Sequence, residues 1–323
     1  MTQQDVIKSL GEDWKKVQNL LIDSLYSDVE LLRRINTGIL DNSGKMLRPM
    51  MTLLVAKLCS GGKTTEESVR YAAAVEILHN ATLIHDDVAD DSDTRRGAPT
   101  VKALLGPTPA VLVGDFWLAK VMSLLAGSDD LRWTTKAFSG TLVDLAEGEM
   151  LQQEKAVKGD TSVEDYLRII FCKTASLFRT ACVCGARSVA APEKYMDAAA
   201  DFGRAMGMAF QIQDDILDYE GEDLGKPVGV DLLERKITLP LLGALEGSSD
   251  EGKIRRMVRE IPQHPGNCEL VRQFVMRNDG VARARVKLDV YVDEALAALE
   301  VFPDSKEKAI LASIAGMSSK RTR

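Results

Sequence analysis

Two short acidic clusters contain the residues of this chain that are best suited to chemistry. A D-D-x-x-D pattern occupies residues 86–90 and occurs again at residues 214–218, each time directly after an apolar, helix-like run. Residues four apart lie on one face of a helix, so the first and last carboxylates of each cluster project together. Mg²⁺ takes one or two carboxylates together with phosphate oxygens. A solvated acidic face is the alternative for one cluster, but the repeated pattern favours two metal-binding sites.

Side chains suited to phosphate binding accompany the first cluster. His79 lies two helical turns before Asp86, near the same stripe, although a lone helical histidine is often structural. An R-R-G sequence follows at residues 95–97, and guanidinium groups match phosphate oxygens in pairs. Upstream, the G-K-x-x-R-P sequence at residues 44–49 enters a helix, where free backbone N–H groups favour an anion. Together these features predict diphosphate capture.

Basic and hydrogen-bonding side chains also accompany the second cluster. Lys173 and Thr174 lie on an otherwise apolar helix, where an unpaired lysine would be costly. Gln211 lies three residues before Asp214 and shares its helical face. Residues 221–229 are rich in glycine and charge, and together with residues 234–240 they bring further lysines over a loop. We therefore expect two acidic walls that hold metal and several basic groups that hold two diphosphates.

Helical periodicity dominates the rest of the chain. Of its 323 residues 45% are hydrophobic and 28% are charged, which is enough for a large core. Apolar residues recur at three- and four-residue steps, and convincing period-2 strands are absent. The expected helical runs are 5–35, 47–59, 65–90, 109–126, 130–156, 162–190, 193–219, 236–246, 250–260, 266–277, 279–300 and 304–317. The pattern predicts one all-α domain over residues 1–323.

Composition also excludes some classes of protein. The net charge is −7 and no basic face for nucleic acid stands out. Five scattered cysteines fit no zinc spacing, so we expect reduced thiols and a cytoplasmic protein. The N-terminus lacks an apolar signal core, and no run approaches 18 uninterrupted apolar residues, so we expect no transmembrane segment.

The motifs together resemble the trans-isoprenyl diphosphate synthases, the polyprenyl synthetase family. The matching sequences lie in the family's order between about residues 44 and 240: G-K-x-x-R-P, E-x-x-H, D-D-x-x-D with R-R-G, K-T-A, F-Q-x-x-D-D-x-x-D and G-K-P-x-G-x-D. The resemblance implies an all-helical bundle with a central cavity, usually a homodimer, that uses Mg²⁺. Two departures are Met46, in place of a common basic residue, and Arg235, where a glycine commonly precedes the lysine.

The resemblance also implies roles for individual residues. Isopentenyl diphosphate would be held by Lys45, Arg48, His79 and Arg96. The allylic prenyl diphosphate would be held by Arg95, Lys173, Lys226 and Lys236, with Thr174 and Gln211 offering oxygens to the cationic intermediate. Mg²⁺ would be bound by Asp86, Asp90 and Asp214, supported by Asp87, Asp215 and Asp218.

Product length is the finer question. Ala81 lies five residues before Asp86, roughly 7.5 Å along the helix axis. In the family a bulky aromatic residue there goes with short products, so Ala81 and the neighbouring Thr82 suggest a medium- or long-chain product such as a quinone side-chain precursor. Phe116 and Trp117 are candidates for the channel floor. Such a product could draw the enzyme to a membrane surface.

Several alternatives remain at this stage. A short-chain farnesyl or geranylgeranyl diphosphate synthase would share the reaction. A class I terpene cyclase would also use D-D-x-x-D, but the chain has only 5% aromatic residues and repeats that pattern at its second site. A non-catalytic subunit of a heteromeric synthase would tend to lose the Asp clusters, and both are intact here.

Overall fold

The computed structural model describes residues 2–220 and 229–320, and it divides into two compact units that interleave along the chain. Unit 1 contains Met1–Gly140, Arg179–Ala200 and Leu299–Ser313, and unit 2 contains Thr141–Phe178, Asp201–Ala298 and Ile314–Arg323. Helices account for nearly all of the described secondary structure, which confirms the all-α prediction. That residues 1–323 form a single domain stays a prediction.

Unit 1 begins with four helices: α1 (Gln3–Leu10), α2 (Glu12–Ser24), α3 (Glu30–Asp41) and α4 (Leu47–Ser60). The sequence predicted one helical run over residues 5–35, and this was wrong. Gly11 takes a φ of 58°, a left-handed value that ends α1. A second break at residues 25–29 turns the chain into α3, where Asn36 Nδ2 donates to the Leu25 carbonyl (2.7 Å).

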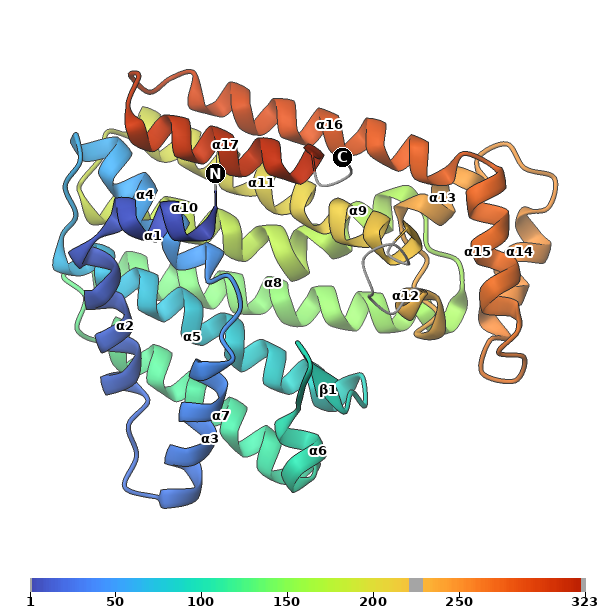
Figure 1. Cartoon of the computed structure of the whole chain (residues 1–323), viewed down its shortest axis with the longest axis horizontal. Coiled ribbons are helices and arrows are strands. Elements are labelled where there is room, and N and C mark those ends of the chain that lie inside the picture. The colour runs from blue at the N-terminus through green and yellow to red at the C-terminus, as the bar shows by residue number, and fades with distance from the viewer. Residues whose placement is uncertain (1, 221–228, 321–323) are drawn as a thin grey trace. The chain divides into compact units, whose positions relative to one another are not determined.

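Helix α5 (Glu66–Ala89) carries the first Asp cluster and begins at a capping box. Thr65 Oγ1 accepts from the Ser68 N–H (3.2 Å), and Ser68 Oγ accepts from the Thr65 N–H (3.0 Å). Helix α7 (Pro107–Leu125) packs along α5, as Figure 1 shows. A Cβ on Gly114 of α7 would lie 2.2 Å from His85 Nε2, so the glycine leaves room for the imidazole ring of α5 against α7.

A two-residue hairpin and a short helix connect α5 to α7. Strands β1 (Thr94–Arg95) and β2 (Ala98–Pro99) pair antiparallel, and α6 (Val101–Leu105) follows them. The sequence predicted no strand here. Arg96 and Gly97 form the turn with φ values of 53° and 79°, the sign that a two-residue hairpin requires. The R-R-G sequence is therefore a turn that points Arg95 and Arg96 in different directions.

Unit 2 contains the second Asp cluster and its own core. Its helices are α9 (Val163–Ile170), the π-helical turn η1 (Phe171–Ala175), α12 (Val230–Leu233), α13 (Leu239–Leu245), α14 (Glu251–Arg259) and α15 (Asn267–Arg277). Five further helices cross the unit boundaries: α8 (Leu131–Lys158), α10 (Ser176–Ser188), α11 (Glu193–Glu220), α16 (Gly280–Leu299) and α17 (Lys306–Lys320). The core includes Tyr166, Ile212, Ile216 and Leu241.

Among the residues that the structure describes, two helical stretches are long and apolar enough to cross a membrane by length and composition alone. Val163–Ser188 has 78% of its apolar window buried, which is typical of a core helix, and Pro107–Leu125 has 33% buried. Core helices of proteins without a membrane span pass the same test, so this is weak evidence for a span. Most of the α7 window is therefore at least partly exposed, and this indicates an apolar face on the surface of unit 1.

Candidate active site

The first Asp cluster lies where α5 ends. The Asp90 N–H donates to the Asp86 carbonyl (2.8 Å), so these two half-buried residues lie one helical turn apart, on the shared face that the sequence predicted. Asp87 is buried and accepts from Arg95 Nε (2.7 Å). Asp86 and Asp90 are therefore the carboxylates with access to a ligand, while Asp87 holds Arg95 in place.

The loop before α4 meets the hairpin turn. A Cβ on Gly44 would lie 2.6 Å from Cζ of Arg96, so the guanidinium group packs directly on the glycine backbone. Arg96 Nη1 also donates to the Asn42 carbonyl (3.4 Å). Met46, one of the two departures from the family pattern, takes a φ of 46° immediately before α4. Unit 1 thus brings together the G-K-x-x-R-P and R-R-G sequences, which lie about fifty residues apart.

Three arginines surround His79 on α5. Burial lowers the pKa of His79 well below its usual value, and the charges of Arg48, Arg96 and Arg95 lower it further. At neutral pH the imidazole is therefore neutral and can donate one N–H to a phosphate oxygen without adding charge. One turn earlier, burial raises the pKa of Glu76, although Arg48 opposes the shift. Unit 1 thus gathers Arg48, His79, Arg95 and Arg96 around one region.

A cavity of about 600 Å³ adjoins these arginines in unit 1. Its walls are mostly aliphatic and come from α3, α5, the hairpin and α6, with Asn80, Leu83, Ile84 and Asp87 supplied by α5. On a 3.6-residue helix those four positions are centred roughly a quarter turn away from the stripe of Asp86 and Asp90. The cavity therefore lies beside the first cluster.

Gly44→Ala tests whether the contact with Arg96 matters for substrate binding. The added Cβ must push the guanidinium group aside. For isopentenyl diphosphate, the substrate that the resemblance implies, we therefore expect the KM to rise about tenfold, the value of one charge-assisted hydrogen bond. Initial-rate kinetics measure this. Gly38→Ala is the matched control, because its Cβ would meet nothing within 4 Å. An unchanged KM in Gly44→Ala would contradict a role for Arg96 in binding this substrate.

In unit 2 the three carboxylates of the second cluster have different surroundings. Asp214 is exposed on α11. Asp218 accepts from the backbone N–H groups of Val230 (3.0 Å) and Asp231 (3.2 Å), so it anchors the start of α12. Burial raises the pKa of Asp215 to about 7. Asp214 is thus the most exposed carboxylate of this cluster, and its role in binding a metal ion stays a prediction.

The K-T-A sequence falls in the π-helical turn η1. Such turns are rare and often mark functional sites. Thr174 Oγ1 donates to Gln211 Oε1 on α11 (2.7 Å), and Lys173 forms an ion pair with Glu149 of α8. Burial opposes ionisation of Glu149, but the charges of Lys173 and Lys236 outweigh it and lower the pKa of that carboxyl. The lysine on an apolar helix therefore has its acidic partner.

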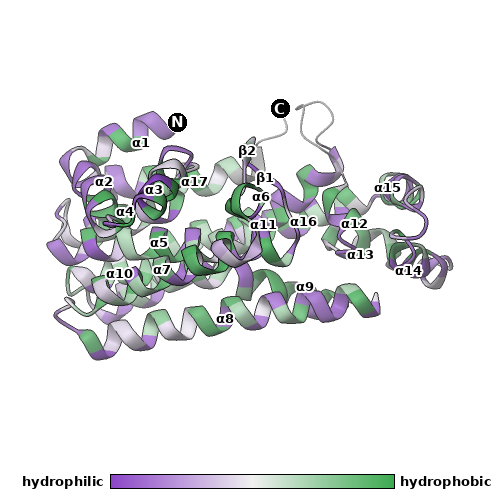
Figure 2. Ribbon diagram, turned by 90° about the horizontal axis from the view of Figure 1, so that it is seen from below, coloured by the Kyte–Doolittle hydropathy of each residue, from purple (hydrophilic) through white to green (hydrophobic). Residues whose placement is uncertain are grey.

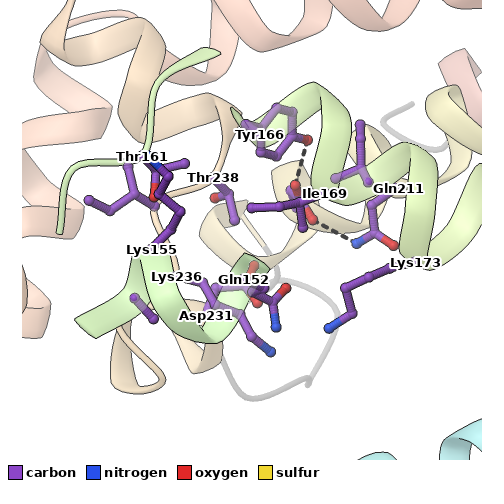
Figure 3. A pocket seen from close by; sticks show the side chains of 14 residues that line it. Gln152, Lys155, Thr161, Tyr166, Ile169, Lys173, Gln211, Asp231, Lys236 and Thr238 are labelled. Atoms are coloured by element: carbon purple, nitrogen blue, oxygen red, sulfur yellow. Dashed lines mark hydrogen bonds between the residues drawn. The ribbon is translucent and has the colours of Figure 1, made fainter. Parts of the chain in front are cut away.

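A small pocket of about 130 Å³, lined by both polar and apolar side chains, lies between these groups (Figure 3). The predicted residues Lys173, Gln211, Asp215 and Lys236 line it, together with others that include Gln152, Tyr166, Asp231 and Thr238. The backbone before Lys236 also shows a departure from the family pattern. Arg235 takes a φ of 60°, which a glycine would adopt at no steric cost.

Not every predicted residue can be placed in this way. Lys226 lies outside the described residues. Lys45 is exposed at the loop before α4, Ala81 is completely buried on α5, and Thr82 Oγ1 donates to the His79 carbonyl (2.8 Å). The two Asp clusters belong to different units, so their joint action stays a prediction.

Within residues 2–220 and 229–320, no three His, Cys, Asp or Glu side chains are arranged to hold a metal ion by themselves. Mg²⁺ seldom needs such a cage, because it keeps water ligands and binds through one or two carboxylates plus substrate phosphate. Asp86 with Asp90, and Asp214 alone, are oxygen donors of this kind. The residues present therefore fit a metal that is held jointly with a diphosphate.

The sequence reasoning missed some residues of the unit 2 pocket. Asp231 ends the G-K-P-x-G-x-D sequence and is a half-buried carboxyl whose pKa is raised well above the usual value by desolvation, but no role was predicted for it. Tyr166 lies seven residues before Lys173, two turns earlier on a helix, and that spacing was the available signal. Glu149 could have been sought as the partner that a lysine on an apolar helix requires.

Comparison with known proteins supports the resemblance. Residues 29–275 match the model of the polyprenyl synthetase family. The chain is 35% identical to an all-trans-nonaprenyl-diphosphate synthase (geranyl-diphosphate specific) of Rhodobacter capsulatus, covering 99% of this chain and 98% of that protein. It is 34% identical to the octaprenyl diphosphate synthase of Escherichia coli, over the full length of both chains.

A solved structure agrees with these relatives. The polyprenyl synthase from Caulobacter crescentus, complexed with calcium and isoprenyl diphosphate, matches with a TM-score of 0.91 at 32% identity, covering 100% of this chain and 98% of that one. The family match, the sequence identity to relatives over their full length and the fold all agree. The chain therefore belongs to the polyprenyl synthetase family of prenyltransferases.

Proposed function

We propose that the chain condenses isopentenyl diphosphate with an allylic prenyl diphosphate, in the trans configuration and with Mg²⁺, to make a medium- or long-chain polyprenyl diphosphate. The observation that carries this proposal is that each unit gathers basic or hydrogen-bonding groups next to a D-D-x-x-D cluster. In unit 1 these groups are Arg48, Arg96 and the neutral His79, and in unit 2 they are Lys173 and Lys236. Two diphosphates need such a pair of sites.

The proposed reaction breaks one C–O bond and forms one C–C bond. The allylic diphosphate departs and leaves a carbocation, which the double bond of isopentenyl diphosphate attacks, and the released diphosphate takes up the proton that is then lost. Mg²⁺ held by Asp86, Asp90 and Asp214 would neutralise the developing charge of the leaving group. Lys173 and Lys236 supply fixed positive charge there, and Gln211 and Thr174 offer oxygen atoms to the cation.

The medium- or long-chain product rests on the small side chain of Ala81 and on the relatives. The two named relatives are nonaprenyl and octaprenyl diphosphate synthases. The test is incubation with Mg²⁺, labelled isopentenyl diphosphate and farnesyl diphosphate, followed by separation of the dephosphorylated products by carbon number. We expect a ladder that ends well beyond geranylgeranyl length. Products that stop at that length indicate a short-chain synthase, and no elongation with any primer indicates a non-catalytic subunit.

We further propose that the protein is a homodimer. Apolar side chains are exposed on α7 of unit 1, among them Val111 (40%), Leu112 (63%) and Met122 (45%). In the unit 2 part of α8, Val143, Met150 and Val157 are exposed at steps of seven residues, which places them on one stripe. Figure 2 shows hydrophobic and hydrophilic residues along the length of α8. A monomer would leave these faces in water.

Light scattering tests the dimer. The wild-type chain is expected at twice the mass of one chain, and Leu112→Glu at the mass of one, because a carboxylate at a buried interface is strongly unfavourable. A monomeric wild-type protein overturns the proposal. We also propose that the enzyme is cytoplasmic, in keeping with five unpaired cysteines, and that it meets a membrane surface only to release its apolar product.

A further inference from the structure

Four side chains behind the second Asp cluster form one continuous hydrogen-bonded chain. Tyr166 Oη donates to Asp215 Oδ2 (2.6 Å), and Gln211 Nε2 donates to Asp215 Oδ1 (2.8 Å). Thr174 Oγ1 then donates to Gln211 Oε1 (2.7 Å). Figure 3 shows the first two bonds converging on one carboxyl group from Tyr166 and Gln211. These hydrogen bonds connect α9 and η1 to α11 inside unit 2.

This series of hydrogen bonds fixes the orientation of the Gln211 amide. Its NH₂ group donates to Asp215 Oδ1 (2.8 Å), and its amide oxygen accepts from Thr174 Oγ1 (2.7 Å). With the amide turned over, its oxygen would face Asp215 and its NH₂ group would face Thr174, so both hydrogen bonds would have to be remade. The orientation of Gln211 and of the Thr174 hydroxyl therefore depends on how Asp215 is held.

Tyr166 is the group that holds the other side of Asp215. Both residues are 3% exposed, so water does not replace a missing partner from bulk solvent. Burial raises the pKa of the Tyr166 phenol well above its usual value, and the hydroxyl stays protonated and remains a donor. A buried carboxylate oxygen without a donor is costly, and Asp215 would turn or shift to recover one. Any such movement changes the Gln211 amide as well.

We propose that Tyr166 is a positioning residue for prenyl transfer, which acts through Asp215 to orient Gln211 and Thr174 beside Lys173. This role rests on the proposed function. Tyr166 itself forms part of the pocket wall together with Ile169 and Ile170, while Gln211 and Lys173 line the same pocket. The Tyr166 hydroxyl thus organises the side chains of unit 2 that we assign to the allylic diphosphate. It does not contribute to the side chains of unit 1 that we assign to isopentenyl diphosphate.

The test compares Tyr166→Phe with Tyr291→Phe. Tyr291 belongs to the same core cluster and is 7% exposed, so both changes remove one phenolic oxygen from similar surroundings. For Tyr166→Phe we expect kcat to fall roughly tenfold to a hundredfold, the range for a hydrogen bond to a charged group. The KM for isopentenyl diphosphate should stay unchanged. Tyr291→Phe should keep kcat within about twofold.

A double-mutant cycle separates positioning from stability. If Tyr166 acts through Gln211, then Tyr166→Phe added to Gln211→Ala should cost much less in kcat than it costs in the wild-type chain. If the wild-type enzyme is active, the inference is overturned either by additive effects in the cycle or by equal kcat values for the two tyrosine variants. A thermal unfolding scan checks that both tyrosine variants are folded. A wild-type chain that makes no product overturns the proposed function, and this role with it.

Discussion

Replacing Asp86 by alanine is expected to reduce kcat by roughly a thousandfold, the upper range for removing one group that stabilises transition-state charge. Asp86 and Asp90 lie one turn apart at the end of α5, and both are half-buried. Without Asp86 the metal would keep one carboxylate of this pair, and the charge of the departing diphosphate would be poorly neutralised. Steady-state turnover with saturating Mg²⁺ and both substrates measures the effect.

Asp91→Asn is the control for that experiment. Asp91 is the next carboxylate after Asp90 along the chain, and its exposed side chain pairs with Lys102. Asp91 takes a φ of 53°, which asparagine also tolerates, so this variant should keep both its turnover and its unfolding temperature. Asp86→Ala should also remain folded, because removing one of several neighbouring carboxylates relieves repulsion. Near-normal turnover of Asp86→Ala would contradict the proposed metal site.

Ala81→Tyr is expected to give the largest change in product, with the main product falling to farnesyl or geranylgeranyl length. Ala81 is completely buried and lies roughly 7.5 Å along α5 from Asp86. A tyrosine ring there would block a hydrocarbon chain that grows along this face of the helix. Carbon-number separation of the products measures the change, and the rate of the first condensations should be largely kept.

Ala74→Tyr provides a graded comparison. Ala74 is equally buried and lies seven residues earlier, which is two turns further along nearly the same helical face. A ring at this deeper position should leave room for longer products than a ring at position 81. Overpacking a core costs about 1–3 kcal/mol, so both variants should show a similar loss of thermal stability. An unchanged length distribution in Ala81→Tyr would contradict the channel beside this residue.

The sequence by itself determined the helical class, the start of α5 and the chemistry of the clusters. These are local properties. Thr65 caps α5 through bonds to a residue three positions away, and Asp86 and Asp90 share a face because four residues make about one turn. The G-K-x-x-R-P and R-R-G sequences indicated anion binding from residue type alone. Nothing beyond a few neighbouring residues was needed for any of these predictions.

Only the tertiary structure decided how those carboxylates differ. Asp86 and Asp87 are neighbours in sequence, yet Asp87 is buried against Arg95. Asp218 anchors α12, while Asp215 receives Tyr166 from another helix. Trp117 donates its Nε1–H to Asn36 (2.9 Å) and joins α7 to α3, while its role as a channel floor stays a prediction. Such partners lie between 8 and 81 residues apart, and periodicity carries no information about which side chain will satisfy a buried polar group.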